Sequence, residues 1–546
     1  MGVHPRAVSR RRRLFIPLLV VLGVTGGVTA YAFLEVRHER SAPRPSSALA
    51  ETPAPAAPPT ASPTATPITS PTATPDATAA PAHDLQARSK YIPAAPERPR
   101  PWVDPATVGT PYGSAVPGVL TFRGNPTRTY YGQGPVPADP EVAWRYPRQG
   151  AWCGPSTVGG ETRTWCGTGW TGQPGVFERD GRTWLVVGAY DHHVHFLDAH
   201  TGERLLPSFA TGDLVKGSVT VDPDGYPLVY IGSRDDHYRA LAIDRDEPVE
   251  LWSLWAYDVA PVLWNSDWDG AGLVLDDHLF IGGENSHLHI VRLNRGYDDE
   301  GLVTVDPELV FHAPGWDDQL LADVGDRNVS IEGSVTMLGS TVYFANSGGL
   351  VQGWDVEGIA DGREPERVFR FWTGDDTDAT IVADEQGYLY VASEWERHTA
   401  RGRSVGQLMK LDPRRPDDPL VWSVHDTGPD LAGFWATPAL HRDIVIAPTH
   451  GGEVLGVERA TGAVRWRLQL QGPTWQSPVV VDDVLIQGDC SGTLRAFDVG
   501  DTQVEPALLW EIGIGGCIES TPAVWDGGIY VGTRAGWLVR VADPEP

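Results

Sequence analysis

The chain has 546 residues and a formal net charge of −28, from 71 Asp and Glu against 43 Lys and Arg. Its first 40 residues hold seven Arg and two Glu, a net charge of +5, so residues 41–546 carry −33. Because so negative a surface repels the phosphate backbone, nucleic acid is excluded as a partner.

The N-terminal segment has the pattern of a membrane anchor. Four arginines at 10–13 precede 21 residues without a charged side chain, from Leu14 to Leu34. A run of this length crosses a bilayer as a helix, and its basic flank stays on the cytoplasmic side. We therefore expect a cytoplasmic tail at 1–13, a transmembrane helix at 14–34 and the rest of the chain outside the cell membrane.

Two other interpretations of this segment lead to the same compartment. The sequence AYA at 30–32 resembles a signal-peptidase site, and cleavage there would make the protein secreted. The sequence RRLFI at 12–16 resembles a twin-arginine signal. All three interpretations export the domain.

Residues 35–100 are predicted to be a disordered linker. From 41 to 82 the chain is almost wholly Pro, Ala, Thr and Ser, as in TASPTATP at 60–67. Such a segment has too little apolar bulk to fold, and it favours extended polyproline conformations. It would act as a spacer between the membrane and residues 101–546.

One unit recurs through the C-terminal half at intervals of about 40 residues. Each copy holds four short apolar runs separated by Gly, Asp or Asn, which is the pattern of a four-stranded antiparallel meander. Such sheets bury both faces only by packing on one another, and a ring leaves no free end. Three copies contain the segments TPAL (437–440) and IVI (444–446), SPVVVDD (477–483) and VLIQG (484–488), and TPAV (521–524) and IYVG (529–532).

Two series of markers each give eight blades. Inner strands are expected to begin near Gly172, Gly217, Trp268, Gly333, Thr377, Thr437, Ser477 and Ser520. Outer strands are expected near Trp144, Leu206, Trp252, Phe311, Phe371, Trp422, Trp466 and Trp510. Because the Trp144 strand precedes every inner strand, residues 141–146 should close the last blade and protect its edge. The predicted fold is all-β: an eight-bladed β-propeller of four-stranded antiparallel blades, preceded by a transmembrane helix and a disordered linker.

The repeats resemble those of a known family. The segments LDAHTGE (197–203) and VERATGAVRW (457–466) are similar to the A-x-D-x-x-T-G-x-x-x-W repeat of pyrroloquinoline-quinone (PQQ) propellers, and FRGNPTR (122–128) is similar to the start of many of them. The resemblance covers roughly residues 118–546 and implies a PQQ-like propeller of the quinoprotein alcohol dehydrogenase-like superfamily. Asp198, Thr201 and Gly202 are expected to shape a turn, since Gly supplies the positive φ that the reversal requires.

The strand order of a meander blade also places the four cysteines. The loop that leads into an inner strand and the turn between the second and third strands lie on one face of the disc, which we call the front face. Cys490 and Cys517 fall in such segments of neighbouring blades, and Cys153 and Cys166 share one long loop. An even count in an exported chain favours disulfides, so we predict Cys153–Cys166 and Cys490–Cys517.

The front face also collects polar and aromatic residues. The residues predicted to bind a ligand there are Trp170, Trp268, Asp267, Glu332, Asp376, Trp435, Trp475 and Glu519. The indoles would serve as apolar platforms amid acidic rims for a protein, peptide or glycan. Alternatively, Asp267, Asp376 and Asp378 would supply oxygen ligands to a hard cation such as Ca²⁺, although their spacing matches no compact calcium loop. A zinc site from His192, His193, His237 and His287 would need residues of different blades.

An enzyme is the remaining alternative. The resemblance to PQQ propellers implies a comparison with quinoprotein dehydrogenases. In those enzymes PQQ lies above a tryptophan, beside Ca²⁺, a catalytic aspartate and commonly a disulfide between adjacent cysteines. The present sequence has no Cys-Cys pair and matches none of those sites residue by residue, so no catalytic residue is assigned and PQQ is not expected. Motifs of nucleophilic hydrolases and zinc proteases are also missing.

The sequence therefore predicts a membrane-tethered, extracytoplasmic PQQ-like propeller that binds or scaffolds a protein, peptide or glycan of the cell envelope. The alternatives are a quinoprotein-type oxidoreductase that uses PQQ and calcium, and a propeller that binds a divalent cation without catalysis.

Overall fold

The computed structural model describes residues 101–158, 160–170, 172–428 and 430–544. They fall into two compact units: the described residues of Thr157–Glu161 belong to one, and the rest form the other. The predicted tail (1–13), anchor (14–34) and linker (35–100) lie outside the described residues. Within those residues, no helix has the length and apolar character that a membrane crossing requires.

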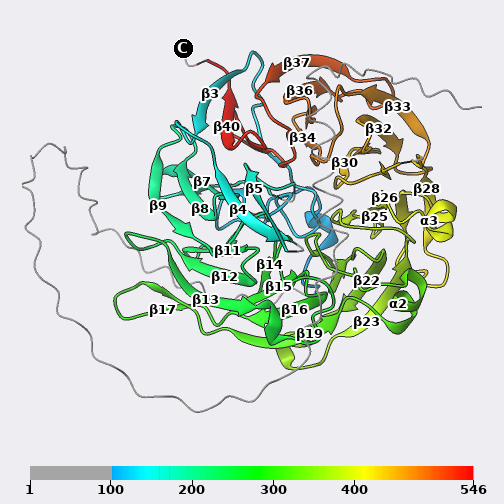
Figure 1. Cartoon of the computed structure of the whole chain (residues 1–546), viewed down its shortest axis with the longest axis horizontal. Coiled ribbons are helices and arrows are strands. Elements are labelled where there is room, and N and C mark those ends of the chain that lie inside the picture. Colours follow the sequence, from blue (N-terminus) through cyan, green and yellow to red (C-terminus); the bar gives the residue numbers. More distant parts are fainter. Residues whose placement is uncertain (1–100, 159, 171, 429, 545–546) are drawn as a thin grey trace, which may run out of the picture. The chain divides into compact units, whose positions relative to one another are not determined.

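The larger unit is a ring of eight sheets, numbered here as blades 1 to 8 in chain order (Figure 1). The predicted eight-bladed propeller is thereby confirmed. From inner to outer strand, blade 1 is β1 (Gly118–Val119), β6 (Gly175–Arg179), β7 (Arg182–Ala189), β8 (His193–Asp198) and β9 (Arg204–Ala210). Blade 2 is β10 (Thr220–Val221), β11 (Leu228–Gly232), β12 (His237–Ala242) and β13 (Val249–Trp255). Blade 3 is β14 (Leu273–Leu275), β15 (His278–Gly282), β16 (His287–Arg292) and β19 (Glu308–Pro314).

The remaining blades follow the same order. Blade 4 is β20 (Thr336–Leu338), β21 (Thr341–Phe344), β22 (Leu350–Asp355) and β23 (Glu366–Trp372), and blade 5 is β24 (Val382–Ala383), β25 (Leu389–Ala392), β27 (Leu408–Leu411) and β28 (Leu420–Val424). Blade 6 is β30 (Ala439–His441), β31 (Ile444–Pro448), β32 (Glu453–Glu458) and β33 (Val464–Gln469). Blade 7 is β34 (Val479–Val481), β35 (Val484–Gly488), β36 (Thr493–Asp498) and β37 (Ala507–Gly513). Blade 8 is β2 (Gly132–Gln133), β38 (Ala523–Trp525), β39 (Gly528–Thr533), β40 (Trp537–Ala542) and β3 (Glu141–Tyr146).

Smaller elements decorate the loops. The two-stranded sheets are β4 (Cys153–Val158) with β5 (Glu161–Cys166), β17 (Gly296–Tyr297) with β18 (Val303–Thr304), and β26 (Glu394–Trp395) with β29 (Ala432–Gly433). The short helices are η2 (Pro105–Thr107), η3 (Ala256–Asp258), α2 (Asp318–Val324), η4 (Ile359–Asp361) and α3 (Ala400–Val405).

The ring closes as predicted. Strand β3 pairs antiparallel with β40, with Glu141 opposite Ala542, so the N-terminal part of the domain completes blade 8. Figure 1 shows β3 beside β40. Strand β2 lies parallel to β38 at the inner edge of the same blade.

Every blade has a one-residue β-bulge between its third strand and its outer strand, and blade 1 has a second register shift there, between Val194 and Phe196. In blade 7, Ala496 faces Trp510 and Phe497 faces Leu508, which leaves Leu509 without a partner. A bulge adds one residue to one strand and increases the local twist. The bulged residues are Ala143, Leu205, Leu251, Val310, Val368, Val421, Arg465 and Leu509.

The repeated Thr-Gly turn positions one blade against the next. The Asp198 carboxylate accepts hydrogen bonds from the backbone N–H groups of His200 and Thr201, and Gly202 has φ +68°. A Cβ at Gly202 would lie 2.8 Å from the Trp144 ring of blade 8. The turn is therefore structural, as expected, and it needs glycine both for its backbone and for space.

Two arginines of the segment FRGNPTR (122–128) lie among the inner strands. Arg123 donates hydrogen bonds to the carbonyl oxygens of Pro438 (3.0 Å) and Pro478 (2.8 Å), in blades 6 and 7. Arg128 donates to those of Ala271 (3.2 Å) and Val335 (2.9 Å), in blades 3 and 4. Burial lowers the pKa of Arg123, and it lowers that of Arg128 to about 9. This segment, which the sequence marked only by its resemblance, joins opposite sides of the ring.

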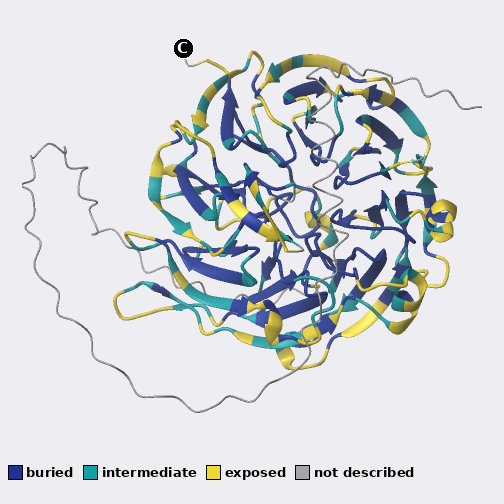
Figure 2. Ribbon diagram, in the orientation of Figure 1, coloured by how far each residue is buried: buried dark blue, intermediate teal, exposed yellow. Residues whose placement is uncertain are grey.

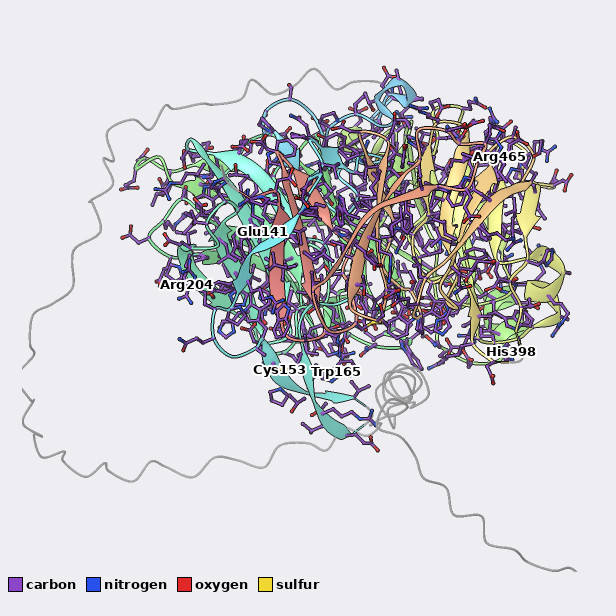
Figure 3. The ribbon with its side chains drawn as sticks, turned by 90° about the horizontal axis from the view of Figure 1, so that it is seen from above. Glu141, Cys153, Trp165, Arg204, His398 and Arg465 are labelled. Carbon is purple, nitrogen blue, oxygen red and sulfur yellow. A yellow bond between two sulfur atoms is a disulfide. The ribbon has the colours of Figure 1, made fainter. Side chains whose placement is uncertain are left out.

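Burial falls from the inner strands to the rim. Strand β31 is buried at every position because neighbouring blades cover both faces, whereas β3 alternates between exposed and half-buried residues (Figure 2). In the side view of Figure 3, Cys153, Trp165 and His398 lie toward one side of the disc, Arg465 lies toward the other, and Glu141 lies between them. The first three belong to loops of the front face. Glu141 is the first residue of the outer strand β3, and Arg465 is the second residue of the outer strand β33.

Candidate binding face

Both predicted disulfides are present, Cys153–Cys166 and Cys490–Cys517. All four cysteines are therefore bonded. The topological argument that placed them on the front face also places the acidic residues described next.

The first acidic cluster spans blades 3 and 4. Asp269 precedes β14, Glu284 lies in the turn after β15, and Glu332 precedes β20; one ligand oxygen of each lies within 4.8 Å of the others. The ammonium group of Lys216 lies 2.5 Å from Asp269 Oδ2 and 3.7 Å from Glu284 Oε1. We call Asp269, Glu284 and Glu332 the first triad.

Burial controls the protonation of the first triad. It raises the pKa of Asp269 to about 6, against the opposing effect of Lys216. Burial, followed by the negative charge of Asp269, raises the pKa of Glu284 well above its usual range. A buried carboxylate is costly unless it is paired, protonated or bound to a cation, and this cluster carries more carboxylates than ammonium groups.

A second triad consists of Asp376, Asp378 and Glu394, again with ligand oxygens within 4.8 Å of one another. All three side chains are buried. The Ser347 hydroxyl joins the two triads, because it donates to Asp378 Oδ1 at 2.8 Å and lies 3.3 Å from Glu332 Oε1. The carboxylates therefore form one network across blades 3 to 5.

The structure separates the residues predicted as metal ligands. Asp376 and Asp378 come together, but Asp267 is paired elsewhere: its Oδ2 accepts a hydrogen bond from Arg234 Nε at 2.6 Å. Glu394 completes the second triad in its place. The sequence contained Asp269, Glu284 and Glu394 among the polar segments of the front face, but nothing in it shows which of these segments converge.

Glu519 lies apart from both triads. Its Oε2 is 3.6 Å from Arg534 Nη1, and the Arg534 guanidinium lies over the Tyr190 ring. The cluster Cys490, Cys517 and Glu519 has the spacing of a metal site, but its cysteines are joined in a disulfide and offer no thiolate.

The tryptophans predicted as platforms are mostly inside the protein. Trp268 is fully buried and packs against Tyr238 and His289, with ring centroids 5.7 and 5.1 Å away. Trp435 and Trp475 stack on each other at 5.8 Å and are both buried. Trp170 is half-buried.

Two aromatic residues that the sequence analysis did not select are exposed instead. Trp255 and Tyr257, at the end of β13 and in η3, have 45% and 40% of their surface exposed. Their ring centroids are 5.0 Å apart, and the Tyr257 hydroxyl lies 3.3 Å from Ser266 Oγ, next to Asp267. We call Trp255 and Tyr257 the aromatic pair. The pair follows the predicted outer-strand marker Trp252 by only a few residues. The spacing of these aromatic residues in the sequence does not show which of their side chains are exposed to solvent.

Comparison with known proteins agrees with the repeats. A PQQ-repeat family model, described as outer membrane protein assembly factor BamB, matches residues 404–542. The predicted resemblance to PQQ-like propellers is confirmed. No curated protein matches the chain.

Three solved structures are similar to this chain. The computationally designed Ika8 protein is 14% identical, with a TM-score of 0.47 and coverage of 69% of this chain and 96% of its own. BamB from Moraxella catarrhalis is 15% identical, with a TM-score of 0.36 and coverage of 71% and 90%. Quinohemoprotein alcohol dehydrogenase from Comamonas testosteroni is 13% identical, with a TM-score of 0.49 and coverage of 78% and 80%. At these values the likenesses carry no argument about function.

Proposed function

We propose that this protein is an exported, membrane-tethered PQQ-like propeller that binds a partner of the cell envelope, a protein, peptide or glycan, through its front face. The anchor pattern at 14–34 and the two disulfides support export, because disulfides persist in oxidising compartments. The exposed aromatic pair supports binding and is the observation that carries the proposal.

The aromatic pair has the properties of a contact site. Tyr and Trp combine a large apolar surface with a polar group, and they are enriched where proteins bind their partners. Here both rings stand in solvent beside each other, while the other tryptophans considered for the face are buried or half-buried. The Tyr257 hydroxyl is hydrogen-bonded to Ser266, which is the neighbour of Asp267 in the chain. This contact holds the aromatic pair near the loop that carries Asp267 and Asp269.

A capture experiment tests this function. The full-length protein and a variant with Trp255→Ala and Tyr257→Ala would be used to capture proteins and glycans from a cell-envelope extract. The matched control is Tyr297→Ala, because Tyr297 is 37% exposed but lies on β17, in the connection between the third and outer strands of blade 3. We expect a ligand that the wild type and the control retain and the double variant loses. Equal capture by all three would refute the proposal.

Binding of a divalent cation is the second candidate, and a specific observation favours it. Glu284 Oε1 is buried and accepts no hydrogen bond from the described residues, while the oxygens of Asp269 and Glu332 lie close by. Carboxylate oxygens are the ligands that Ca²⁺ prefers. If Ca²⁺ binds, the melting temperature should rise with added Ca²⁺ and fall back with a chelator, and Asp378→Asn or Glu284→Gln should reduce the response of its own triad.

The residues do not fit PQQ. An indole that supports the cofactor must offer a free ring face, but Trp268 is fully buried between other aromatic rings and Trp475 is stacked on Trp435. We therefore derive no reaction through this group.

A further inference from the structure

The outer edge of blade 7 is unusually apolar. Val504, Leu508 and Leu509 have 54%, 51% and 50% of their surface exposed, the highest values of any large hydrophobic residue in the described chain. All three lie within six residues of one another, in β37 or just before it. Scattered exposed leucines are ordinary, whereas a cluster on one strand suggests a contact surface.

The bulge allows the same position to be compared among blades. Leu509 is the bulged residue of blade 7, and Leu508 is the residue before it. The residue before the bulge is charged in blades 1, 2 and 4, where it is Arg204, Glu250 and Arg367. A charge on an edge strand prevents unwanted pairing. Blades 3, 5, 6 and 8 also have an apolar residue at this position, Leu309, Leu420, Val464 and Val142, but each of these is half-buried, whereas Leu508 of blade 7 is exposed.

The edge itself is open. In blade 7, β37 pairs with β36 on one side, and no other described strand pairs with its outer side. The Trp510 indole N–H is engaged elsewhere, because it donates to the carbonyl oxygen of Pro137 at 2.8 Å. Leu508 and Leu509 therefore stand beside backbone groups that another strand can reach.

The charges around the edge select the kind of strand. Residues 498–513 include four carboxylates, on Asp498, Asp501, Glu505 and Glu511, and no Lys, Arg or His. All four of these acidic residues are exposed. Glu511 pairs with Arg495 of β36 at 3.2 Å, so the other three carboxylates supply most of the negative charge. Positive side chains beside an apolar stretch would complement this arrangement.

We infer that the outer edge of β37 binds an extended segment of a partner protein by β-strand addition, with apolar residues over Leu508 and Leu509 and Lys or Arg residues at its ends. In this mode the backbone hydrogen bonds give affinity and the side chains give specificity. The surface lies on the circumference of the disc, so it is separate from the front face and goes beyond the function proposed above.

A synthetic peptide tests this inference. The probe is Lys-Val-Thr-Val-Thr-Val-Lys with a fluorescent label, and its binding to the full-length protein would be followed by anisotropy. Two comparison peptides carry either Glu in place of both Lys or Pro in place of the central Val. We expect binding of the Lys peptide, weaker binding of the Glu peptide and no binding of the Pro peptide, which cannot complete the ladder.

Variants of the edge locate the site. Leu508→Lys and Leu509→Lys should each weaken binding of the probe by about tenfold or more, because apolar contact is lost and the edge gains a repelling charge. Val368→Lys is the control, since Val368 is the bulged residue of blade 4 and is 47% exposed. It should leave the affinity unchanged, and melting curves should show that all three variants are folded.

Three results would overturn the inference. The first is that the Lys peptide does not bind. The second is that it binds equally to the edge variants and the wild type. The third is concentration-dependent dimerisation of the wild type that Leu509→Lys abolishes, because the edge would then serve a second copy of this chain.

Discussion

The Nη1 atom of Arg123 donates a 2.8 Å hydrogen bond to the carbonyl oxygen of Pro478, 355 residues further along the chain. The same guanidinium group binds Pro438, so one buried side chain holds the starts of two inner strands. Its removal would leave these buried carbonyl groups without the donors that they have here.

Arg123→Met should therefore destabilise the propeller. We expect the free energy of unfolding to fall by about 3 kcal/mol or more, as measured by urea denaturation. Arg179→Met is the control, because Arg179 is half-buried and its guanidinium contacts its neighbour Asp180 and the Trp184 ring rather than buried carbonyl groups. A similar small effect of both substitutions would contradict the structural role of Arg123.

Gly202→Ala tests the packing of the Thr-Gly turn on Trp144. The new Cβ would suffer from the positive φ and would also meet the ring at 2.8 Å. Gly181→Ala isolates the first effect, because Gly181 has φ +71° and nothing within 4 Å of the added Cβ. We expect a loss of about 1 to 2 kcal/mol at Gly181 and a clearly larger loss at Gly202, measured by thermal unfolding. Equal losses of stability in the two variants would show that the Trp144 ring moves aside without cost.

The first triad should make stability depend on pH. The pKa of Asp269 rises from 3.8 to about 6 on folding, so between these values the folded protein binds more protons than the unfolded chain. Its stabilising effect is complete below the unfolded pKa and is lost as the pH rises through about 6. Melting temperatures measured with a chelator present should therefore decline across this interval.

Glu284→Gln should reduce that decline. The amide cannot ionise, so the variant avoids the unfavourable charge that the raised pKa of Glu284 indicates. We expect a higher melting temperature than the wild type at pH 8 and a similar one at pH 4. Glu308→Gln, at a side chain with 65% exposure, should change neither value. A variant less stable than the wild type at pH 8 would mean that Glu284 is required as a carboxylate.

Loss of the Cys490–Cys517 bond should cost more than loss of Cys153–Cys166. The first closes a separation of 27 residues and the second one of 13, and a longer loop loses more entropy when it is closed. Replacing both cysteines of a pair by serine should cost on the order of 3 kcal/mol, with the larger loss for Cys490 and Cys517. Calorimetry of the two double variants measures both losses. A larger loss for Cys153 and Cys166 than for Cys490 and Cys517 would contradict the prediction.

Sequence reasoning reached the architecture because each blade repeats its own local pattern. The Trp144 strand was assigned to blade 8 from its order alone, and β3 pairs with β40 as expected. The disulfides followed from the same order. Turn residues such as Gly202 were also placed correctly, since their backbone requirements are local.

The candidate site was harder to predict from the sequence, because it depends on contacts between residues of different blades. Topology brings Asp267 to the correct face, but only the three-dimensional structure shows that Arg234 of the preceding blade neutralises it and that Glu394 joins Asp376 and Asp378. Likewise, the composition of a loop does not reveal whether Trp268 or Trp255 faces solvent. These outcomes are set by distances between segments far apart in the chain.

The pairing of β3 with β40 also fixes when the domain can be finished. Blade 8 takes two strands from residues 132–146 and three from residues 523–542. During synthesis, which proceeds from the N-terminus, β3 cannot complete its pairing until the last strand, β40, has been made. A chain that stops before residue 523 would lack three strands of blade 8 and would leave an open arc with two unpaired ends. The ring therefore closes only after the strands at 523–542 have been made.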